Sequence, residues 1–75
     1  MKRRVEHELR VLGDNVKALR RAMSLSQEDL ALQAEVDRTY VSQIERAVGN
    51  PSVLVLFKIS EVLGVELAAL FTKQK

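Results

Sequence analysis

A segment near the middle of the chain, residues 38–46, carries polar side chains of the types that bind nucleic acid. On a helical wheel, Val41 and Ile44 point to one side of this segment. The opposite half has two arginines, two hydroxyls and one amide, contributed by Arg38, Thr39, Ser42, Gln43 and Arg46. Arginine binds guanine through two hydrogen bonds, glutamine binds adenine likewise, and hydroxyls adapt to either. Because this half carries no acidic residue, the pattern favours a DNA-contacting surface over an ordinary solvated helix face.

The flanking residues predict that this segment is the second of two short helices joined by a tight turn. Ser26 is placed as an N-cap with Asp29 three residues later, so the first helix of this pair spans about residues 27–35. Asp37 is placed as the N-cap of the second helix. Two capped helices at this spacing, the second polar outward, form a helix-turn-helix unit. We therefore expect a DNA-binding helix-turn-helix over about residues 26–46.

The rest of the chain also has the apolar spacing of helices. A first helix carries one apolar stripe, made of Val5, Leu9, Leu12, Val16, Leu19 and Met23. Gly13 lies within this helix, where it either allows a neighbouring helix to approach closely or lets the first two turns fray. Ser52 caps a fourth helix that ends at Gly64, and residues 66–71 form a short fifth helix. The expected fold is therefore all-α, with five helices.

Composition and charge limit the functions that the chain can have. With 75 residues there is room for one core, so we expect a single domain over residues 1–75. The absence of cysteine excludes disulfides and thiolate metal sites and suits a reducing cytoplasm. No apolar run approaches the roughly 18 residues that span a membrane. His7 is the only histidine and no nucleophile–base set is visible, so we expect no enzyme activity, cofactor, metal or small-molecule ligand.

The stretch from residue 12 to residue 71 resembles the Cro/repressor-type helix-turn-helix proteins of phages and bacteria, the XRE family. The resemblance lies in Leu19-Arg20, Leu25 to Ala31, Val41 to Arg46, Asn50-Pro51-Ser52, and Lys58-Ile59 through Leu63-Gly64-Val65. It implies a lambda-repressor-like fold and sequence-specific binding of double-stranded DNA. The string from Asp37 to Arg46 is similar to the recognition helix of restriction-modification controller proteins. The chain departs from the family at Ser24 and Glu35, where glycine is usual.

The resemblance also implies a role for each polar residue of the predicted surface. Base edges would be read by Arg38, Thr39, Ser42 and Gln43. The DNA backbone would be bound by Gln27, Tyr40, Arg46, Asn50 and Ser52. For Tyr40 the alternative is packing at the edge of the core, and for Asn50 and Ser52 it is loop and capping duty. Arg20 and Glu45 would form an ion pair that ties the first helix to the third and orients it.

The fourth helix has more apolar residues than its core stripe of Leu56, Ile59 and Leu63 requires. Exposed apolar patches on small domains often mark interfaces, and helix-turn-helix dimers read half-sites about 34 Å apart. We therefore expect a homodimer on a palindromic operator. The candidate interface residues are Leu54, Val55, Val65, Leu67, Leu70 and Phe71. The alternative is that about half of these side chains complete the monomer core.

An antitoxin of the same fold, which binds a toxin partner and its own promoter, is the alternative function. Genomic context separates the two hypotheses. A restriction endonuclease or methyltransferase gene beside this one favours a controller, whereas a second small protein that co-purifies from the adjacent gene favours an antitoxin.

Overall fold

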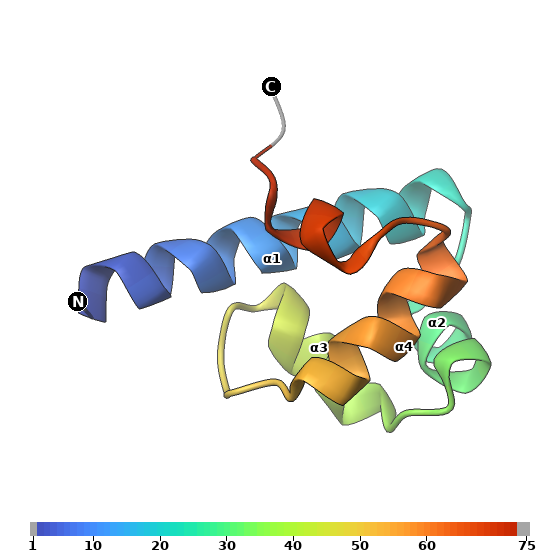
Figure 1. Cartoon of the computed structure of the whole chain (residues 1–75). Coiled ribbons are helices and arrows are strands. Elements are labelled where there is room, and N and C mark those ends of the chain that lie inside the picture. Colours follow the sequence, from blue (N-terminus) through green and yellow to red (C-terminus); the bar gives the residue numbers. More distant parts are fainter. Residues whose placement is uncertain (1, 74–75) are drawn as a thin grey trace.

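The structure, a computed structural model, describes residues 2–73 of the chain and is helical almost throughout (Figure 1). Its elements are α1 (Lys2–Ala22), α2 (Gln27–Ala34), α3 (Arg38–Glu45), α4 (Val53–Leu63) and the 3-10 helix η1 (Leu67–Phe71). No strand occurs over this described range. The predicted all-α class is therefore confirmed, and none of the described helices is long and apolar enough to cross a membrane.

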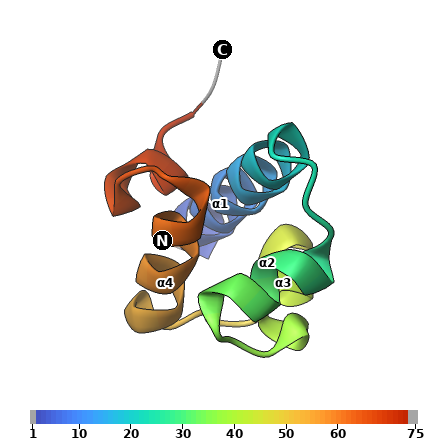
Figure 2. The same cartoon turned by 90° about the vertical axis from the view of Figure 1, so that its right-hand side faces the viewer.

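The five elements form a closed ring around one core. α1 contacts α3, α3 contacts α2, α2 contacts α4, α4 contacts η1, and η1 contacts α1 again. Figure 2 shows the ring along α1, with α2 and α3 on one side and α4 with η1 on the other. The longest dimension of the molecule is 33 Å, which matches a 21-residue helix at about 1.5 Å per residue. α1 therefore sets the length of the domain, and the shorter elements pack along part of it.

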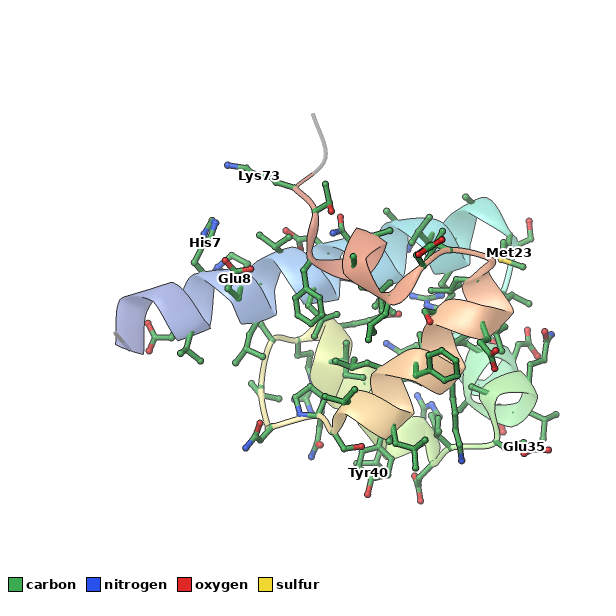
Figure 3. All side chains as sticks on the ribbon, in the orientation of Figure 1. His7, Glu8, Met23, Glu35, Tyr40 and Lys73 are labelled. Atoms are coloured by element: carbon green, nitrogen blue, oxygen red, sulfur yellow. The ribbon has the colours of Figure 1, made fainter. Side chains whose placement is uncertain are left out.

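Every element of the ring contributes apolar side chains to the core. The buried ones are Leu12, Val16, Leu30, Ala31, Ala34, Val41, Ile44, Leu56, Ile59, Leu63 and Leu70. The inward faces predicted for the third and fourth helices are thus confirmed. The apolar stripe predicted for the first helix is confirmed only in its middle. Val5 is 58% exposed and Met23 is 46% exposed, because α1 projects past its neighbours at one end and Met23 follows the other end (Figures 1 and 3).

Side-chain caps define where α2 begins. The Ser26 hydroxyl accepts a hydrogen bond from the Asp29 backbone N–H at 2.9 Å, and the Asp29 carboxylate accepts one from the Ser26 N–H at 3.0 Å. This reciprocal pair is the predicted capping box, and it satisfies two backbone donors that a helix N-terminus leaves free. The hydrogen bonds from Ser26 hold the pKa of the Asp29 carboxyl below its ordinary value.

The predicted caps of the next two helices are also present. Asp37 accepts a hydrogen bond from the Thr39 N–H at 2.8 Å, which lowers the pKa of the Asp37 carboxyl and begins α3. Ser52 accepts one from the Val55 N–H at 3.1 Å and begins α4. α4 ends at Gly64, whose φ of 73° is the left-handed conformation expected after a helix.

Three non-glycine residues adopt left-handed backbone conformations at the turns. Ser24 follows α1 and Glu35 follows α2, both with a φ of 59°, and Ala47 follows α3 with a φ of 60°. Ser24 and Glu35 are the two positions where the sequence departs from the glycine usual in the family. The turns therefore keep the geometry that glycine would give, at the steric cost that a Cβ carries in this region.

The fifth predicted helix forms as a 3-10 helix of five residues, not as an α-helix. Its N-cap residue, Glu66, makes no side-chain capping hydrogen bond, and so short a segment has little helical stability of its own. Leu70 within it is fully buried. The prediction that Leu70 lies on a dimer surface is therefore wrong, because its side chain completes the monomer core.

Candidate nucleic-acid interface

The face of α3 that is turned away from the core carries the four predicted base-reading residues. Val41 and Ile44 are buried on the inner side of the helix, which fixes the rotation of α3 about its axis. On the outer side, Arg38 and Thr39 in the first turn are exposed, while Ser42 and Gln43 in the second turn are half-buried. Arg38 and Thr39 therefore present the most accessible polar groups, and Ser42 and Gln43 lie closer to neighbouring residues.

Gln43 is held against the loop that follows α3. A Cβ placed on Gly49 would lie 3.2 Å from the Gln43 side-chain oxygen, so the loop backbone passes directly over this amide. The backbone carbonyl of Gln43 also accepts a hydrogen bond from the Val48 N–H at 2.9 Å. A hollow of about 30 Å³, large enough for one water, adjoins the same amide. Gly49 is thus required twice, for its φ of 81° and for this close approach.

The same small hollow brings together three of the predicted DNA-contacting residues. Tyr40 and Gln43 from α3 and Asn50 from the following loop all line it. Tyr40 is 46% exposed, and Figure 3 shows its side chain at the edge of the molecule, away from η1 and α1. With about half of the residue exposed, the contact and the packing interpretations of Tyr40 are both consistent with its place.

The remaining predicted backbone contacts lie at the C-terminal end of α3 and in the loop beyond it. Arg46 is the C-cap residue of α3 and is exposed, and Asn50 is exposed as well. The Ser52 hydroxyl is occupied by the Val55 N–H in the α4 cap, so the capping role of Ser52 is observed directly. Together these residues extend the polar surface of α3 toward the N-terminus of α4.

A buried ion pair connects α1 to the end of α3. The structure brings Arg20 and Glu45 together, as the resemblance implied: Nε and Nη2 of Arg20 donate to the two carboxylate oxygens of Glu45 at 2.6 and 2.9 Å. Nη1 of Arg20 also donates to the Leu25 carbonyl at 2.7 Å. The two parallel hydrogen bonds hold α3 to α1 more firmly than a single contact would. The bond to Leu25 adds the turn before α2 to the same cluster.

The charges of this pair are stabilised by each other. Burial raises the pKa of Glu45, but hydrogen bonds from Arg20 and Gln27 outweigh it, and the pKa lies below its ordinary value. The hydrogen bond to Glu45 likewise raises the pKa of Arg20. Both groups therefore stay ionised at neutral pH, and Glu45 is withdrawn from the outer face of α3.

Gln27 joins this network, a contact that sequence reasoning missed. Its Nε2 donates to Oε1 of Glu45 at 3.1 Å, so the first residue of α2 is tied to the last residue of α3. An amide nitrogen carries two hydrogens, and the second one has no partner among the described residues. The sequence shows only that Gln27 begins the first of the paired helices and that Glu45 ends the second.

An open hollow of about 430 Å³ lies beside Gln27, at the N-terminus of α2. Its lining residues are Arg20, Ser26, Gln27, Glu28 and Arg38. The hollow places Arg38 from α3 next to the first turn of α2, where backbone N–H groups favour anions. Because Arg20 is neutralised by Glu45, Arg38 supplies the unpaired positive charge here. Arg38 therefore borders both the outer face of α3 and this open hollow, which Glu28 also lines.

α3 is also positioned by a close contact between backbones. A Cβ added to Gly13 in α1 would lie only 2.5 Å from the Ile44 carbonyl oxygen and 3.1 Å from that of Glu45. Of the two roles that the sequence left open for Gly13, close approach by a neighbouring helix is the one observed. The last turn of α3 therefore rests on α1 at Gly13 and is clamped beside it by Arg20.

A family model described as helix-turn-helix, HTH_3, matches residues 16–70. The chain is 46% identical over 61 residues to control protein C.MunI of Mycoplasma sp, covering 80% of this chain and 82% of that protein. The restriction-modification controller protein C.AhdI from Aeromonas hydrophila has a TM-score of 0.81 at 37% identity, covering 87% and 98% of the two chains. The N-terminal DNA-binding domain of SinR from Bacillus subtilis also has a TM-score of 0.81, at 35% identity and 87% and 96% coverage.

The family model includes α2 and α3 with the turn between them, and it extends into η1 as far as Leu70. Sequence motifs, fold and relatives therefore agree, and the chain belongs to the HTH_3 family of helix-turn-helix proteins.

Proposed function

We propose that the chain is a transcriptional regulator that binds duplex DNA by laying α3 in the major groove. The observation that carries this proposal is the outer face of α3, which presents polar side chains and no acidic side chain of its own while Glu45 is buried in an ion pair. A helix in the major groove needs hydrogen-bonding groups that are held at fixed positions. The contacts at Gly13 and Arg20 supply that rigidity from α1.

Base reading and backbone binding are divided between two sets of residues in this proposal. Base edges meet Arg38, Thr39, Ser42 and Gln43, and phosphates meet Gln27, Tyr40, Arg46, Asn50 and the N-terminus of α4 at Ser52. The hollow beside Gln27 supports one phosphate site, because the unpaired amide hydrogen of Gln27 and the first turn of α2 converge there. The exposure of Arg46 and Asn50 supports a second group of phosphate contacts at the other end of α3.

We infer that two copies bind a palindromic operator, and the exposed apolar side chains of α4 support this. Val53, Leu54 and Phe57 are 69%, 62% and 47% exposed and share one face of the helix. Phe71 in η1, which packs against α4, is 39% exposed. Burying such side chains in a two-fold interface contributes roughly 25 cal/mol for each Å² removed from water. The half-buried Val55, Val65 and Leu67 pack partly on the core and support the same surface from beneath.

The relatives support a specific biological role, control of restriction-modification genes. Both C.MunI and C.AhdI are control proteins, and each is covered over most of its length by this chain. We propose that the operator lies upstream of this gene and of a neighbouring endonuclease or methyltransferase gene, and that the protein acts in the cytoplasm. No observation favours a toxin partner.

Selection of bound duplexes from a random pool tests the DNA-binding proposal directly. The expected product is a palindrome whose two half-sites are centred about 10 base pairs apart, one helical turn. Competition with unrelated duplex at several salt concentrations then measures specificity separately from phosphate binding. Enrichment of no sequence above the starting pool would overturn sequence-specific binding, and enrichment of a lone half-site would overturn the dimeric operator.

A further inference from the structure

Asn15 is a buried polar residue in the middle of α1 that the DNA-binding surface does not use. Only 3% of the residue is exposed, and it lies among the apolar side chains that α1 turns toward the core. Its side-chain Nδ2 donates to the Leu70 carbonyl and to the Thr72 carbonyl, each at 2.9 Å. Both hydrogens of the amide are therefore used on one short stretch of backbone at the end of η1.

The stretch that Asn15 holds is short. η1 has only five residues, and no side chain caps its N-terminus at Glu66. Leu70 is the residue of η1 that is fully buried. Just beyond η1, Lys73 lines a hollow of about 380 Å³ together with α1 residues that include His7 and Arg10 (Figure 3). The hydrogen bonds from Asn15 and the burial of Leu70 both fix the end of η1 to α1.

The two hydrogen bonds bracket Phe71. Asn15 binds the carbonyl of Leu70 on one side of Phe71 and the carbonyl of Thr72 on the other. These carbonyls belong to the peptide groups that precede Phe71 and follow Thr72, so the two bonds restrain the backbone of this two-residue stretch, and with it the direction in which the partly exposed Phe71 side chain leaves the domain. Asn15 therefore acts on a surface residue from the inside of the molecule.

We propose that Asn15 is a positioning residue for subunit pairing: it holds Phe71 and the end of η1 in the arrangement that a second copy of this chain recognises. The inference rests on the proposed homodimer. A segment that is already ordered in the monomer loses less conformational entropy on association, so preorganisation raises affinity without adding a contact. Asn15 binds the end of η1, whereas α3 contacts α1 at other residues. Loss of the Asn15 side chain should therefore leave the proposed DNA-facing side in place.

The test replaces Asn15 by a side chain of similar size that cannot donate. For Asn15→Leu we expect the dimer dissociation constant, measured by sedimentation, to rise about tenfold or more, because the end of η1 must then be ordered on association. Binding of the monomer to a duplex with one half-site should stay within about twofold of wild type, since phosphate and base contacts are unchanged. Hydrogen exchange at Thr72, whose N–H bonds to Ala69, should accelerate while α3 stays protected.

Val16→Ala is the matched control. Val16 is the next residue in α1 and is fully buried, so its truncation lowers the stability of the same region without touching the donors of Asn15. This control should lower the melting temperature and leave the dimer dissociation constant unchanged. If Asn15→Leu does not fold by circular dichroism, Asn15→Ala takes its place, because the smaller side chain lets water reach the two carbonyls.

The outcomes separate the inference from the proposed homodimer. A wild-type chain that stays monomeric at tens of micromolar, free and on a full operator, overturns the homodimer and this role together. A wild-type dimer that Asn15→Leu leaves equally tight overturns only the role of Asn15. Equal weakening of pairing by Asn15→Leu and by Val16→Ala at matched stability also overturns it, because the effect would then follow from stability alone.

Discussion

At the scale of single residues, the two exposed arginines of α3 should differ in what their loss does to DNA binding. Arg46→Ala removes a proposed phosphate contact, so we expect weaker binding to every duplex. The slope of log binding constant against log salt concentration should also become shallower by about one. Arg38→Ala removes a proposed guanine contact, so discrimination at one base pair should fall by about 1–3 kcal/mol. Binding isotherms at three salt concentrations on operator and single-base variants measure both quantities.

The hollow beside Gln27 makes this comparison demanding for Arg38. Arg38 borders that hollow as well as the outer face of α3. If Arg38→Ala weakened all duplexes equally and also reduced the salt dependence, Arg38 would be a backbone contact and the proposed division between the two arginines would be wrong. Lys58→Ala, on the half-buried side of α4, serves as a control for loss of one positive charge elsewhere.

Glu45 should dominate the stability of the link between α1 and α3. Glu45→Gln leaves the buried Arg20 without a counter-charge, so we expect the free energy of unfolding to fall by about 2–3 kcal/mol. Glu61→Gln, at an exposed position on α4, should change it by less than about 0.5 kcal/mol. Urea denaturation of the two variants and wild type at neutral pH makes the comparison. Equal effects would show that the ion pair contributes nothing to the fold.

The same carboxylates predict how stability responds to acid. Folding lowers the pKa of Glu45, where hydrogen bonds overcome burial, and that of Asp29 and Asp37, which accept capping hydrogen bonds. A carboxyl whose pKa is depressed by folding stabilises the fold fully above its ordinary pKa and loses that contribution as the pH falls through the folded value. Stability should therefore be flat near neutrality and decline below roughly pH 4.

Glu45→Gln provides the check on that assignment. A glutamine at this position does not titrate, so the variant should lose less free energy of unfolding between pH 5 and pH 3 than wild type, by the share that Glu45 carries. The remaining decline belongs to the two capping aspartates. Parallel pH profiles for variant and wild type would remove Glu45 from the explanation of acid sensitivity.

At the scale of elements, the turn between α2 and α3 sets how the outer face of α3 is aimed. Glu35 occupies it with a left-handed backbone and also places a negative charge at the C-terminal end of α2, where the helix dipole disfavours it. We expect Glu35→Gly to stabilise the fold by about 0.5–1 kcal/mol. Glycine removes the steric cost of the left-handed backbone, and this gain exceeds the loss from the greater freedom of glycine in the unfolded chain. Gly64→Ala, which makes the reverse exchange at a φ of 73°, should destabilise it. Thermal unfolding distinguishes the two directions.

The contact of α1 with α3 gives a second prediction at this scale. Gly13→Ala raises helix propensity by about 1 kcal/mol, but the new methyl would meet the Ile44 carbonyl at 2.5 Å. We therefore expect α3 to be displaced, with lower stability and weaker specific DNA binding. Ala18→Gly, at an exposed position of α1, should cost stability alone. Unchanged operator affinity in Gly13→Ala would show that α3 is not aimed by this contact.

The sequence predicts the elements well where the signal is local. Ser26, Asp37 and Ser52 each satisfy backbone donors within three residues, so their caps could be read directly from the sequence. Contacts between distant segments were harder. The pairing of Arg20 with Glu45 came from family resemblance, while the bond from Gln27 to Glu45 depends on the angle between two helices, which periodicity does not encode.

Burial was predicted less well than helical structure, because it also depends on contacts between distant segments. The apolar stripe of α1 continues past the point where neighbouring elements end, so Val5 is exposed although its spacing is that of a core residue. Leu70 shows the opposite case, because a short 3-10 helix turns it inward to complete the ring. Asn15 lies outside the predicted apolar stripe of α1, and its two partners are visible only in the structure, where η1 packs back onto α1.

At the scale of the whole molecule, the ring of helices separates two surfaces. α3 lies on one side of α1, and η1 lies on the other side with α4 beside it (Figure 2). The polar face of α3 and the exposed apolar side chains of α4 and η1 therefore belong to different parts of the same small core. Subunit pairing and half-site binding should be separable by mutation, as long as the core that joins them stays folded.

Leu54→Glu tests this separation on the proposed pairing surface, with Leu32→Glu as its match. Both leucines are exposed, at 62% on α4 and 77% on α2, so neither charge should disturb the core. We expect Leu54→Glu to prevent dimers at concentrations where wild type pairs, because a buried carboxylate without a partner is costly. Leu32→Glu should pair normally. Leu32→Glu should bind a single half-site with wild-type affinity, whereas Leu54→Glu should weaken half-site binding by no more than about one phosphate contact, because its charge lies two residues from Ser52. Sedimentation and duplex titration measure both variants side by side. Two variants that pair alike would move the interface away from α4, and loss of half-site binding by Leu54→Glu would show that the two surfaces are coupled through the core.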